Sequence, residues 1–412
     1  MTEVGRDFTE FDKSCMAEAL RLAAMGLFTT SPNPNVGCVI ASANGAVVGR
    51  GYHAKAGTPH AEVHALREAG EQAAGATAYV TLEPCSHFGR TPPCADALIN
   101  AGIARVVVAM QDPYHKVAGR GIEKLRAAGI EVAVGLFAAQ AAALNKGFIC
   151  RATTGKPYVR VKLAQSLDGR TALSNGQSKW ITSAEARHDV QFGRAQCSAL
   201  LTGAGTVMAD DPLLNVRLAL DEYQSQAHLR RALANEALYQ EVAATEALSL
   251  PATLAQKALS EVRQPARVVV DNRCEIHDLL QLWQVDAPIW LASPHHCEDG
   301  LNCELPAHGE YLWVDTGPDD SRINLPQLIE LLGQRDVNDL WVEAGASLAG
   351  ALLSHDLVDE LVVYTAPRLM GPDATGLIDM PTLSAMHQVP QFEFSEVERV
   401  GTDLKLTVRI TR

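Results

Sequence analysis

A histidine, a glutamate and two cysteines occur in this chain in an order that suits a catalytic metal site. Glu62 follows His60 by two residues, and Cys85 and Cys94 come later, each preceded by a proline. One imidazole and two thiolates leave one position of a tetrahedral zinc ion open, as catalytic zinc requires, whereas structural zinc takes four protein ligands. We therefore predict that His60, Cys85 and Cys94 bind one Zn²⁺ ion per chain.

Glu62 is near enough to His60 in the sequence to lie beside a zinc-bound water without being a ligand. Zinc lowers the pKa of its water to about 7, so that hydroxide is available at neutral pH. A glutamate in this place carries a proton from that water to a leaving amine, which is the chemistry of a hydrolytic deaminase acting on a heteroaromatic ring. We predict that Glu62 is the catalytic residue. Asn33, between two prolines, is predicted to bind the substrate, and turn formation is the alternative explanation for it.

The elements that must position these residues predict an α/β domain. Apolar residues at helical spacing indicate a helix over 11–28, and β-rich runs on either side of Asn44-Gly45 predict a hairpin at 36–41 and 47–52. Helices and strands then alternate, which predicts a three-layer domain with helices on both faces of a sheet. The alternating segments are 61–69, 76–82, 94–101, 105–109, 119–128 and 130–134. The three ligands should therefore converge at one edge of the sheet.

A second α/β domain is predicted after residue 150, so that the chain divides into 1–150 and 151–412. Gly155-Lys156-Pro157 precedes a new strand at 158–164, and a helix is expected at 183–195. Further strands are expected at 199–202, 267–271, 289–292, 339–343 and 360–366. The stretch 218–264, rich in Ala, Leu, Glu and Gln, is predicted to be a helical insertion.

Composition and charge narrow the class of partner. The formal net charge is −13 and no run of Lys or Arg occurs, which argues against binding to nucleic acid through its phosphates. No segment approaches eighteen uninterrupted apolar residues, and the N-terminal residues have no apolar core of signal-peptide length. We expect a cytoplasmic protein that acts on small molecules, binds neither nucleic acid nor membrane, and forms a homo-oligomer.

The spacing of the cysteines separates this chain from many deaminases. Eight residues lie between Cys85 and Cys94, whereas nucleic-acid and cytidine deaminases usually have two. This long loop, which adds His87 and Arg90 near the metal, resembles that of the bifunctional riboflavin-biosynthesis deaminase/reductases. The segments that carry the resemblance are 33–37, 60–66 and 83–94 in the first half, and 162–170, 178–183, 203–207 and 210–212 in the second.

The resemblance implies a cytidine-deaminase-like domain followed by a dihydrofolate-reductase-like domain, and two consecutive reactions. The first removes the 2-amino group of 2,5-diamino-6-(5-phosphoribosylamino)pyrimidin-4(3H)-one, and the second reduces the ribose of the product to a ribityl chain with NADPH. The implied NADPH contacts are Ala164, Trp180, Thr206, Asp210, Gly345, Ala346, Ser347, Leu348, Ala349, Gly350 and Ala351. The implied substrate contacts in the second domain are Ser178, Arg194, Leu214, Arg217 and Glu343.

The sequence leaves open an alternative function and the position of one predicted substrate residue, Arg217. The alternative is a nucleic-acid or nucleotide base deaminase with a non-catalytic binding domain, against which the net charge and the cysteine loop both argue. The question concerns Arg217, because the predicted insertion begins directly after it, where the family commonly has a short loop. The sequence therefore leaves the position of Arg217 to be established.

Overall fold

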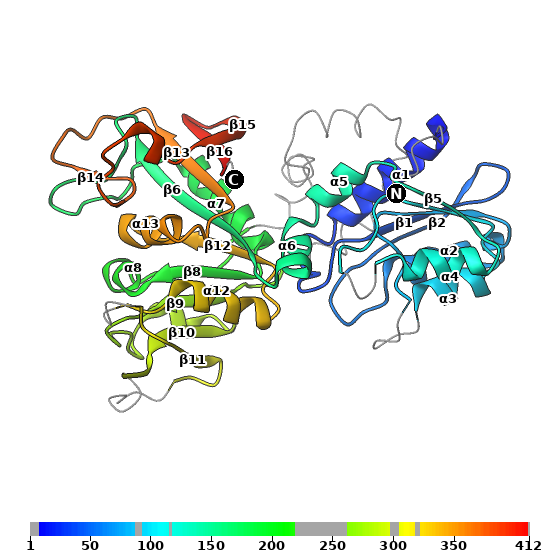
Figure 1. Ribbon diagram of the computed structural model, residues 1–412, viewed down its shortest axis with the longest axis horizontal. Helices are drawn as coiled ribbons and strands as arrows, with labels where there is room; N and C mark the ends of the chain where they lie inside the picture. The colour runs from blue at the N-terminus through cyan, green and yellow to red at the C-terminus, as the bar shows by residue number, and fades with distance from the viewer. Residues whose placement is uncertain are drawn as a thin grey trace. The chain divides into compact units, whose positions relative to one another are not determined.

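The computed structural model describes residues 8–86, 93–114, 118–218, 262–296, 305–317 and 322–410. The chain forms two compact units (Figure 1): unit 1 contains Met1–Thr154 and Ala219–Arg263, and unit 2 contains Gly155–Leu218 and Gln264–Arg412. Helix α6, Lys146–Thr154, crosses the boundary that the sequence predicted at 150. Of the predicted insertion 218–264, residues 219–261 lie outside the described residues, as do His87 and Arg90.

Unit 1 is built on a five-stranded sheet with the order β2-β1-β3-β4-β5. Strand β1 is antiparallel to both β2 and β3, while β3, β4 and β5 are parallel to one another. The strands are β1 Gly37–Ala41, β2 Val47–Tyr52, β3 Thr77–Val80, β4 Arg105–Val108 and β5 Glu131–Val134. The predicted hairpin and alternating strands are all present.

Helices cover both faces of this sheet (Figure 1), so the predicted three-layer architecture is confirmed. One face packs against α1 Glu10–Ala24 and α5 Ala138–Ala143, and the other against α2 Ala61–Ala69, α3 Cys94–Asn100 and α4 Arg120–Ala127. A short 3₁₀ helix, Gly70–Ala73, follows α2. Helix α1 ends before the predicted residue 28, because the carbonyl of Gly26 accepts the backbone N–H groups of Thr29 and Thr30 in a turn.

Two glycines on β2 let α2 lie unusually close to the sheet. A Cβ atom at Gly51 would lie 2.1 Å from the carbonyl oxygen of Ala61, and one at Gly49 would lie 2.2 Å from that of Ala65. Only glycine permits such an approach of helix backbone to strand backbone. These contacts therefore set the position of the first turn of α2, which carries His60 and Glu62.

Unit 2 is built on a nine-stranded sheet with the order β11-β10-β9-β8-β12-β6-β13-β16-β15. The strands from β11 to β13 in this order are parallel, and β16 and β15 are antiparallel additions at one edge. The strands are β6 Tyr158–Ser166, β8 Ala199–Gly203, β9 Ala266–Val270, β10 Ile289–Pro294, β11 Gly309–Val314, β12 Asp339–Glu343, β13 Glu360–Ala366, β15 Phe392–Val400 and β16 Asp403–Ile410; β7 Arg170–Ala172 and β14 Thr375–Gly376 form a separate pair.

The helices of unit 2 also lie on both faces of its sheet. Side chains of α12 Leu325–Gln334 and α13 Ala346–Ser354 share one apolar core, and those of α7 Ala184–Gln196 and α8 Ala204–Asp210 share another. Along β8, Leu201 belongs to the first core and Leu200 to the second, as the alternation of a strand requires. The 3₁₀ helices are Gln281–Gln284 and Met386–Gln388. The predicted second α/β domain is confirmed.

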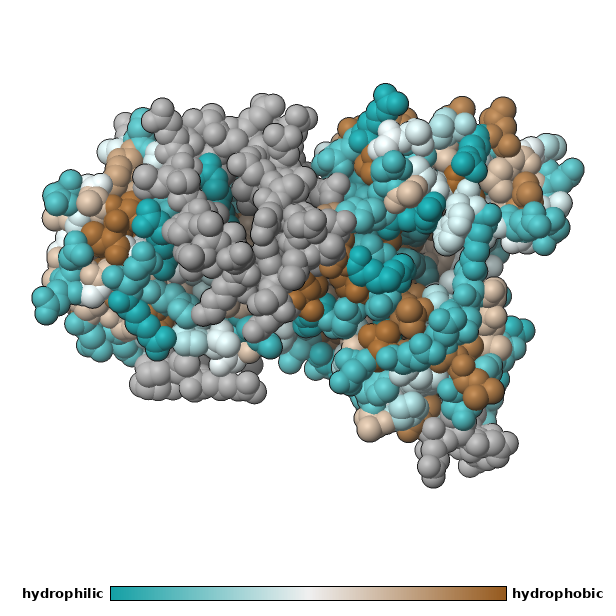
Figure 2. Space-filling view, turned by 180° about the vertical axis from the view of Figure 1, so that it is seen from behind, coloured by the Kyte–Doolittle hydropathy of each residue, from teal (hydrophilic) through white to brown (hydrophobic). Residues whose placement is uncertain are grey.

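Figure 2 shows small groups of apolar residues among hydrophilic ones on the face that it presents. Within the described ranges, no helix is both long enough and apolar enough to span a membrane.

Candidate active sites

The three predicted metal ligands meet in unit 1 from separate segments. His60 caps the N-terminus of α2, Cys94 is the first residue of α3, and Cys85 lies in the loop after β3. Their ligand atoms all lie within 4.8 Å of one another, and Nδ1 of His60 is 3.2 Å from Sγ of Cys94 and 3.7 Å from Sγ of Cys85. Bonds of about 2.0 Å to nitrogen and 2.3 Å to sulfur at tetrahedral angles separate the two ligand atoms by roughly 3.6 Å. The donor set therefore fits zinc in chemistry and in spacing.

Cys85 is held in the form that binds a metal. Hydrogen bonds from the Cys94 side chain, the His60 imidazole and the backbone N–H of Cys94 lower the pKa of the Cys85 thiol, while the hydrogen bond to Cys85 and burial raise the pKa of Cys94. The same interaction with Cys85 raises the pKa of His60. A thiolate rather than a thiol is the metal ligand, so the site provides its first charged donor through its own contacts.

Glu83 fixes the loop that carries Cys85, a role that sequence analysis did not assign. Its buried carboxylate accepts hydrogen bonds from four backbone N–H groups at and before the start of α4, those of Asp112, Gly119, Gly121 and Ile122, at 3.1, 2.9, 2.8 and 3.3 Å. A carboxylate at a helix N-terminus is favoured by the helix dipole. The only signal in the sequence was the position of Glu83 directly before Pro84-Cys85.

Glu62 lies beside the metal ligands with an unused oxygen. The side chain is buried, and burial raises the pKa of its carboxyl to about 7. Its Oε2 atom has no hydrogen-bond partner among the described residues, although an unpaired buried oxygen is costly. Glu62, His60 and Cys85 line a cavity of about 660 Å³ that also contains Asn33. A water or a substrate in this cavity would supply the missing partner.

Asn33 is oriented by a histidine that the sequence did not single out. Nδ2 of Asn33 lies 3.0 Å from Nε2 of His53, and Nδ1 of His53 lies 3.3 Å from the carbonyl oxygen of Pro59. The imidazole therefore donates from Nδ1 to Pro59 and accepts from Asn33 at Nε2. Burial lowers the pKa of His53 to about 4, which keeps the ring neutral in this arrangement. His53 also packs edge-on against His60, with ring centroids 5.2 Å apart.

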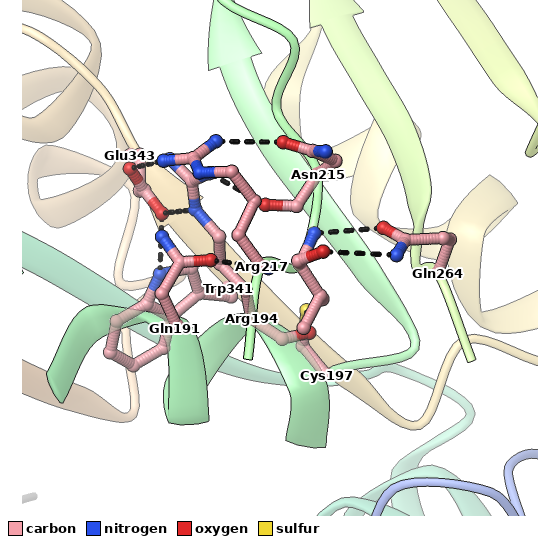
Figure 3. A network of polar contacts seen from close by, with 9 residues as sticks. Gln191, Arg194, Cys197, Asn215, Arg217, Gln264, Trp341 and Glu343 are labelled. Carbon is pink, nitrogen blue, oxygen red and sulfur yellow. Dashed lines mark hydrogen bonds and ion pairs between the residues drawn. The ribbon is translucent and has the colours of Figure 1, made fainter. Parts of the chain in front are cut away.

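In unit 2, two predicted substrate residues form an ion pair (Figure 3). Nε and Nη2 of Arg194, on α7, donate to the two carboxylate oxygens of Glu343, at the end of β12, at 2.6 and 2.8 Å. The indole Nε1 of Trp341 donates to the same carboxylate at 3.0 Å. Although burial alone would raise the pKa of Glu343, the Arg194 guanidinium lowers it to about 2. Lys162, in register with Glu343 on the neighbouring β6, has a pKa that burial lowers.

Arg217 lies in the same network. Its Nη1 atom donates to Oδ1 of Asn215 at 2.7 Å, and Nη1 of Arg194 donates to the backbone carbonyl of Asn215 at 3.0 Å (Figure 3). Arg217 is exposed, whereas Leu214 is buried. Ser178 is an exposed residue of the loop before α7. The structure thus brings Arg194, Arg217 and Glu343 together, a convergence across segments far apart in sequence.

A second cavity, of about 870 Å³, lies at the carboxyl ends of parallel strands in unit 2, where α/β sheets place their ligands. Of the predicted NADPH contacts, Ser347, Leu348 and Ala351 line it, together with Gly203 at the end of β8. Gly345 caps the N-terminus of α13 and Ala346 is the first residue of that helix. Ala349 is buried in the core, and a Cβ atom at Gly350 would clash with the carbonyl oxygen of Asp379.

The remaining predicted NADPH contacts are distributed around unit 2. Ala164 is half-buried on β6, and Thr206 is half-buried in α8. Asp210 forms an ion pair with Lys179 at 2.6 Å. Trp180 is 61% exposed, and the Arg187 guanidinium lies 4.4 Å from the centre of its ring. A large exposed aromatic surface of this kind is available to stack against a flat ligand.

Comparisons with known proteins cover both units. Residues 9–110 match the family model for the cytidine and deoxycytidylate deaminase zinc-binding region, and residues 157–406 match the model for the RibD C-terminal domain. The riboflavin biosynthesis protein RibD of Escherichia coli K12 is 49% identical over 395 residues, which covers 96% of this chain and 98% of the relative. The RibD protein of Haemophilus influenzae is 45% identical over 402 residues, covering 97% and 98%.

Solved structures agree with these matches over the whole chain. RibD of Acinetobacter baumannii, in one crystal form, has a TM-score of 0.80 at 40% identity and covers 98% of this chain and 99% of its own. The diaminohydroxyphosphoribosylaminopyrimidine deaminase/5-amino-6-(5-phosphoribosylamino)uracil reductase of Thermotoga maritima has a TM-score of 0.78 at 29% identity, covering 97% and 99%. The similarity therefore includes both units in one chain.

Proposed function

Since this chain belongs to the RibD family and is a bifunctional deaminase and reductase of riboflavin biosynthesis, we propose how its residues divide the two reactions. Unit 1 removes the 2-amino group of 2,5-diamino-6-(5-phosphoribosylamino)pyrimidin-4(3H)-one, and unit 2 reduces the ribose of that product with NADPH. Membership of this family argues against the alternative of a nucleic-acid or nucleotide base deaminase with a non-catalytic binding domain. We assign the deaminase domain to residues 1–150 and the reductase domain to residues 151–412.

The observation that carries the deaminase proposal is the cluster of His60, Cys85 and Cys94 with the unpaired oxygen of Glu62 beside it. When held by these three ligands, zinc supplies the Lewis acid that activates water for attack on the amino-bearing ring carbon. Glu62 accepts a proton from the attacking water at Oε2 and returns it to the departing ammonia. Burial raises the pKa of Glu62 above its ordinary range, which favours a carboxyl that both accepts and donates a proton.

Asn33 holds the pyrimidine in the deaminase cavity. Its carboxamide is oriented by the hydrogen bond to His53, whose own tautomer is set by the Pro59 carbonyl. Preorganised hydrogen-bonding groups orient the substrate without a cost at the moment of reaction. We therefore assign Asn33 to substrate binding and His53 to the support of Asn33.

In the reductase domain, Arg217 is the proposed contact for the ribose phosphate, because its guanidinium is exposed and already aligned by Asn215. Glu343, kept ionised and fixed by Arg194, contacts substrate hydroxyl groups, with Ser178 and Leu214 completing the site. NADPH supplies the hydride when bound. Its proposed contacts are Ala164, Trp180, Thr206, Asp210 and the 345–351 segment, of which Ser347, Leu348 and Ala351 face the large cavity of unit 2.

The test is to incubate the purified, zinc-loaded protein with the diaminopyrimidine phosphate and NADPH, and to follow ammonia and NADPH together. We expect ammonia to appear first and NADPH oxidation to follow to the same total. Ammonia without NADPH loss would contradict the reductase assignment, and NADPH loss that precedes ammonia would contradict the order of reactions. We also propose a cytoplasmic homo-oligomer, and light scattering on the purified protein measures the number of chains in it.

A further inference from the structure

Gln264 makes a two-point contact with the backbone of Val216. Val216 N donates to Oε1 of Gln264 at 2.8 Å, and Nε2 of Gln264 donates to the carbonyl of Val216 at 3.1 Å (Figure 3). Val216 is buried and belongs to no helix or strand, so its backbone groups have no ladder to join. The Gln264 carboxamide therefore satisfies both backbone groups of Val216, as a hydrogen-bonded residue on a neighbouring strand does in a β-sheet. The two residues are 48 positions apart in the chain.

The residues on either side of Val216 are held in the same manner. The backbone N–H of Arg217 donates to Oε1 of Gln191 at 2.9 Å, and the backbone carbonyl of Asn215 accepts from Arg194 at 3.0 Å. Consecutive backbone polar groups from the carbonyl of Asn215 to the N–H of Arg217 are thus all bonded to side chains of unit 2. The segment that carries Arg217 is fixed although it has no regular secondary structure.

This fixed backbone determines where the Arg217 guanidinium lies. The side chain is exposed and is aligned by Oδ1 of Asn215, two residues earlier on the same segment. A shift of Val216 would move Asn215 and Arg217 together. Removing the Gln264 carboxamide would leave a buried N–H and a buried carbonyl unpaired, which the chain relieves by moving the segment.

We propose that Gln264 is a positioning residue of the reductase, which fixes the segment 215–217 so that Arg217 meets the phosphate of the substrate. The inference rests on the proposed function of Arg217 and adds Gln264, the last residue of the predicted insertion 218–264. It also answers the question of where Arg217 lies. Gln264, at the end of the predicted insertion, bonds the backbone of Val216, which is next to Arg217 and shortly precedes the insertion.

The test measures kcat and KM for NADPH oxidation with the deaminated substrate and with its dephosphorylated counterpart. The full-length proteins compared are the wild type, Arg217→Ala, Gln264→Ala and the double variant. We expect Arg217→Ala to raise KM about 100-fold and Gln264→Ala about 10-fold for the phosphorylated substrate, with little change for the dephosphorylated one. The double variant should match Arg217→Ala alone, because Gln264 acts through Arg217.

The matched control is Gln388→Ala, since Oε1 of Gln388 also accepts from backbone N–H groups, those of Ser384 and Ala385, elsewhere in unit 2. It should leave both KM values unchanged. Equal losses with both substrates in Gln264→Ala, or additive losses in the double variant, would overturn the inference while leaving the role of Arg217 intact. No phosphate discrimination by Arg217 would overturn both. If Gln264→Ala does not fold, Gln264→Glu, which keeps the acceptor for Val216 N–H, provides the same comparison.

Discussion

The two units solve the problem of placing reactive groups in different ways. In unit 1, zinc demands nitrogen and sulfur donors at short distances, so His60, Cys85 and Cys94 are specified both by type and by position. In unit 2, the site is assembled from an ion pair and from side chains that bind backbone groups, as between Gln264 and Val216. A metal site is thus specified by the chemistry of its ligands, whereas a site for a phosphate and a nicotinamide depends on supporting contacts from distant segments.

The largest expected effect abolishes the reaction of unit 1 and leaves that of unit 2 unchanged. Glu62→Gln should lower ammonia release by about 10³-fold or more, because the carboxamide cannot carry the proton, while zinc content stays at the wild-type level. NADPH oxidation with the deaminated product should be unchanged. Ammonia release and zinc stoichiometry, measured on the same preparation, test this. Loss of zinc from the variant would show that Glu62 acts on the metal site rather than on protons.

The next effect concerns the ion pair of unit 2 and depends on pH. The pKa of Glu343 is lowered to about 2 in the folded protein, so the pair stabilises unit 2 fully above pH about 5 and loses this contribution as the pH falls toward 2. The contribution is on the order of 3 kcal/mol at pH 7 and falls by about half at pH 3. Calorimetry of the wild type and Glu343→Gln across this range measures it. A difference between the two that does not change with pH would contradict the prediction.

A smaller effect should fall on unit 1 alone. Gly51→Ala places a Cβ atom against the Ala61 carbonyl and pushes α2, with His60 and Glu62, away from the sheet. We expect a loss of about 1–3 kcal/mol of stability and slower ammonia release, with the reductase unaffected. Gly376→Ala is the matched control, because a Cβ atom there meets nothing within 4 Å. Equal effects of the two substitutions would argue against the close packing of α2 as the cause.

The smallest effects compare one helix cap in each unit. The Thr9 side chain accepts from the N–H of Asp12 at the start of α1, and Ser183 accepts from that of Ala186 at the start of α7. Replacing either by Ala should cost about 1 kcal/mol. Thr9→Ala should make deaminase activity more sensitive to heat, and Ser183→Ala should do so for reductase activity. The prediction fails if heat inactivation of the other activity shifts instead.

Much of the fold was predictable from the sequence because apolar spacing and turn residues act locally. The layers of unit 1 and the parallel core of unit 2 follow from such patterns. Strands β11, β15 and β16 of the large sheet were not predicted. β11 and β15 are the two edges of that sheet, and on β15 Phe394 and Val397 are more than half exposed and polar residues weaken the strand pattern. Helix α1 ended earlier than its apolar pattern, since a turn around Gly26 competes with the helix.

The metal ligands were predictable because zinc requires particular residue types, whereas the residues that hold the site in place were not predictable. No local pattern marks Glu83 as the acceptor for N–H groups at α4, or His53 as the partner of Asn33, because these contacts join residues 20 or more positions apart. The same holds for Gln264 and Gln191 around Arg217. Supporting residues are defined by the folded backbone that they bind, which the sequence alone does not give.

The most direct test of the account is complementation between two damaged chains. Glu62→Gln cannot release ammonia and Arg217→Ala reduces its product poorly, so neither variant alone should oxidise NADPH efficiently from the diaminopyrimidine phosphate. If each unit completes its own reaction, mixing the two variants should restore NADPH oxidation at a rate set by ammonia release. A mixture that releases ammonia but leaves NADPH unoxidised, although Glu62→Gln oxidises NADPH when given the deaminated product, would contradict the account of two self-contained sites.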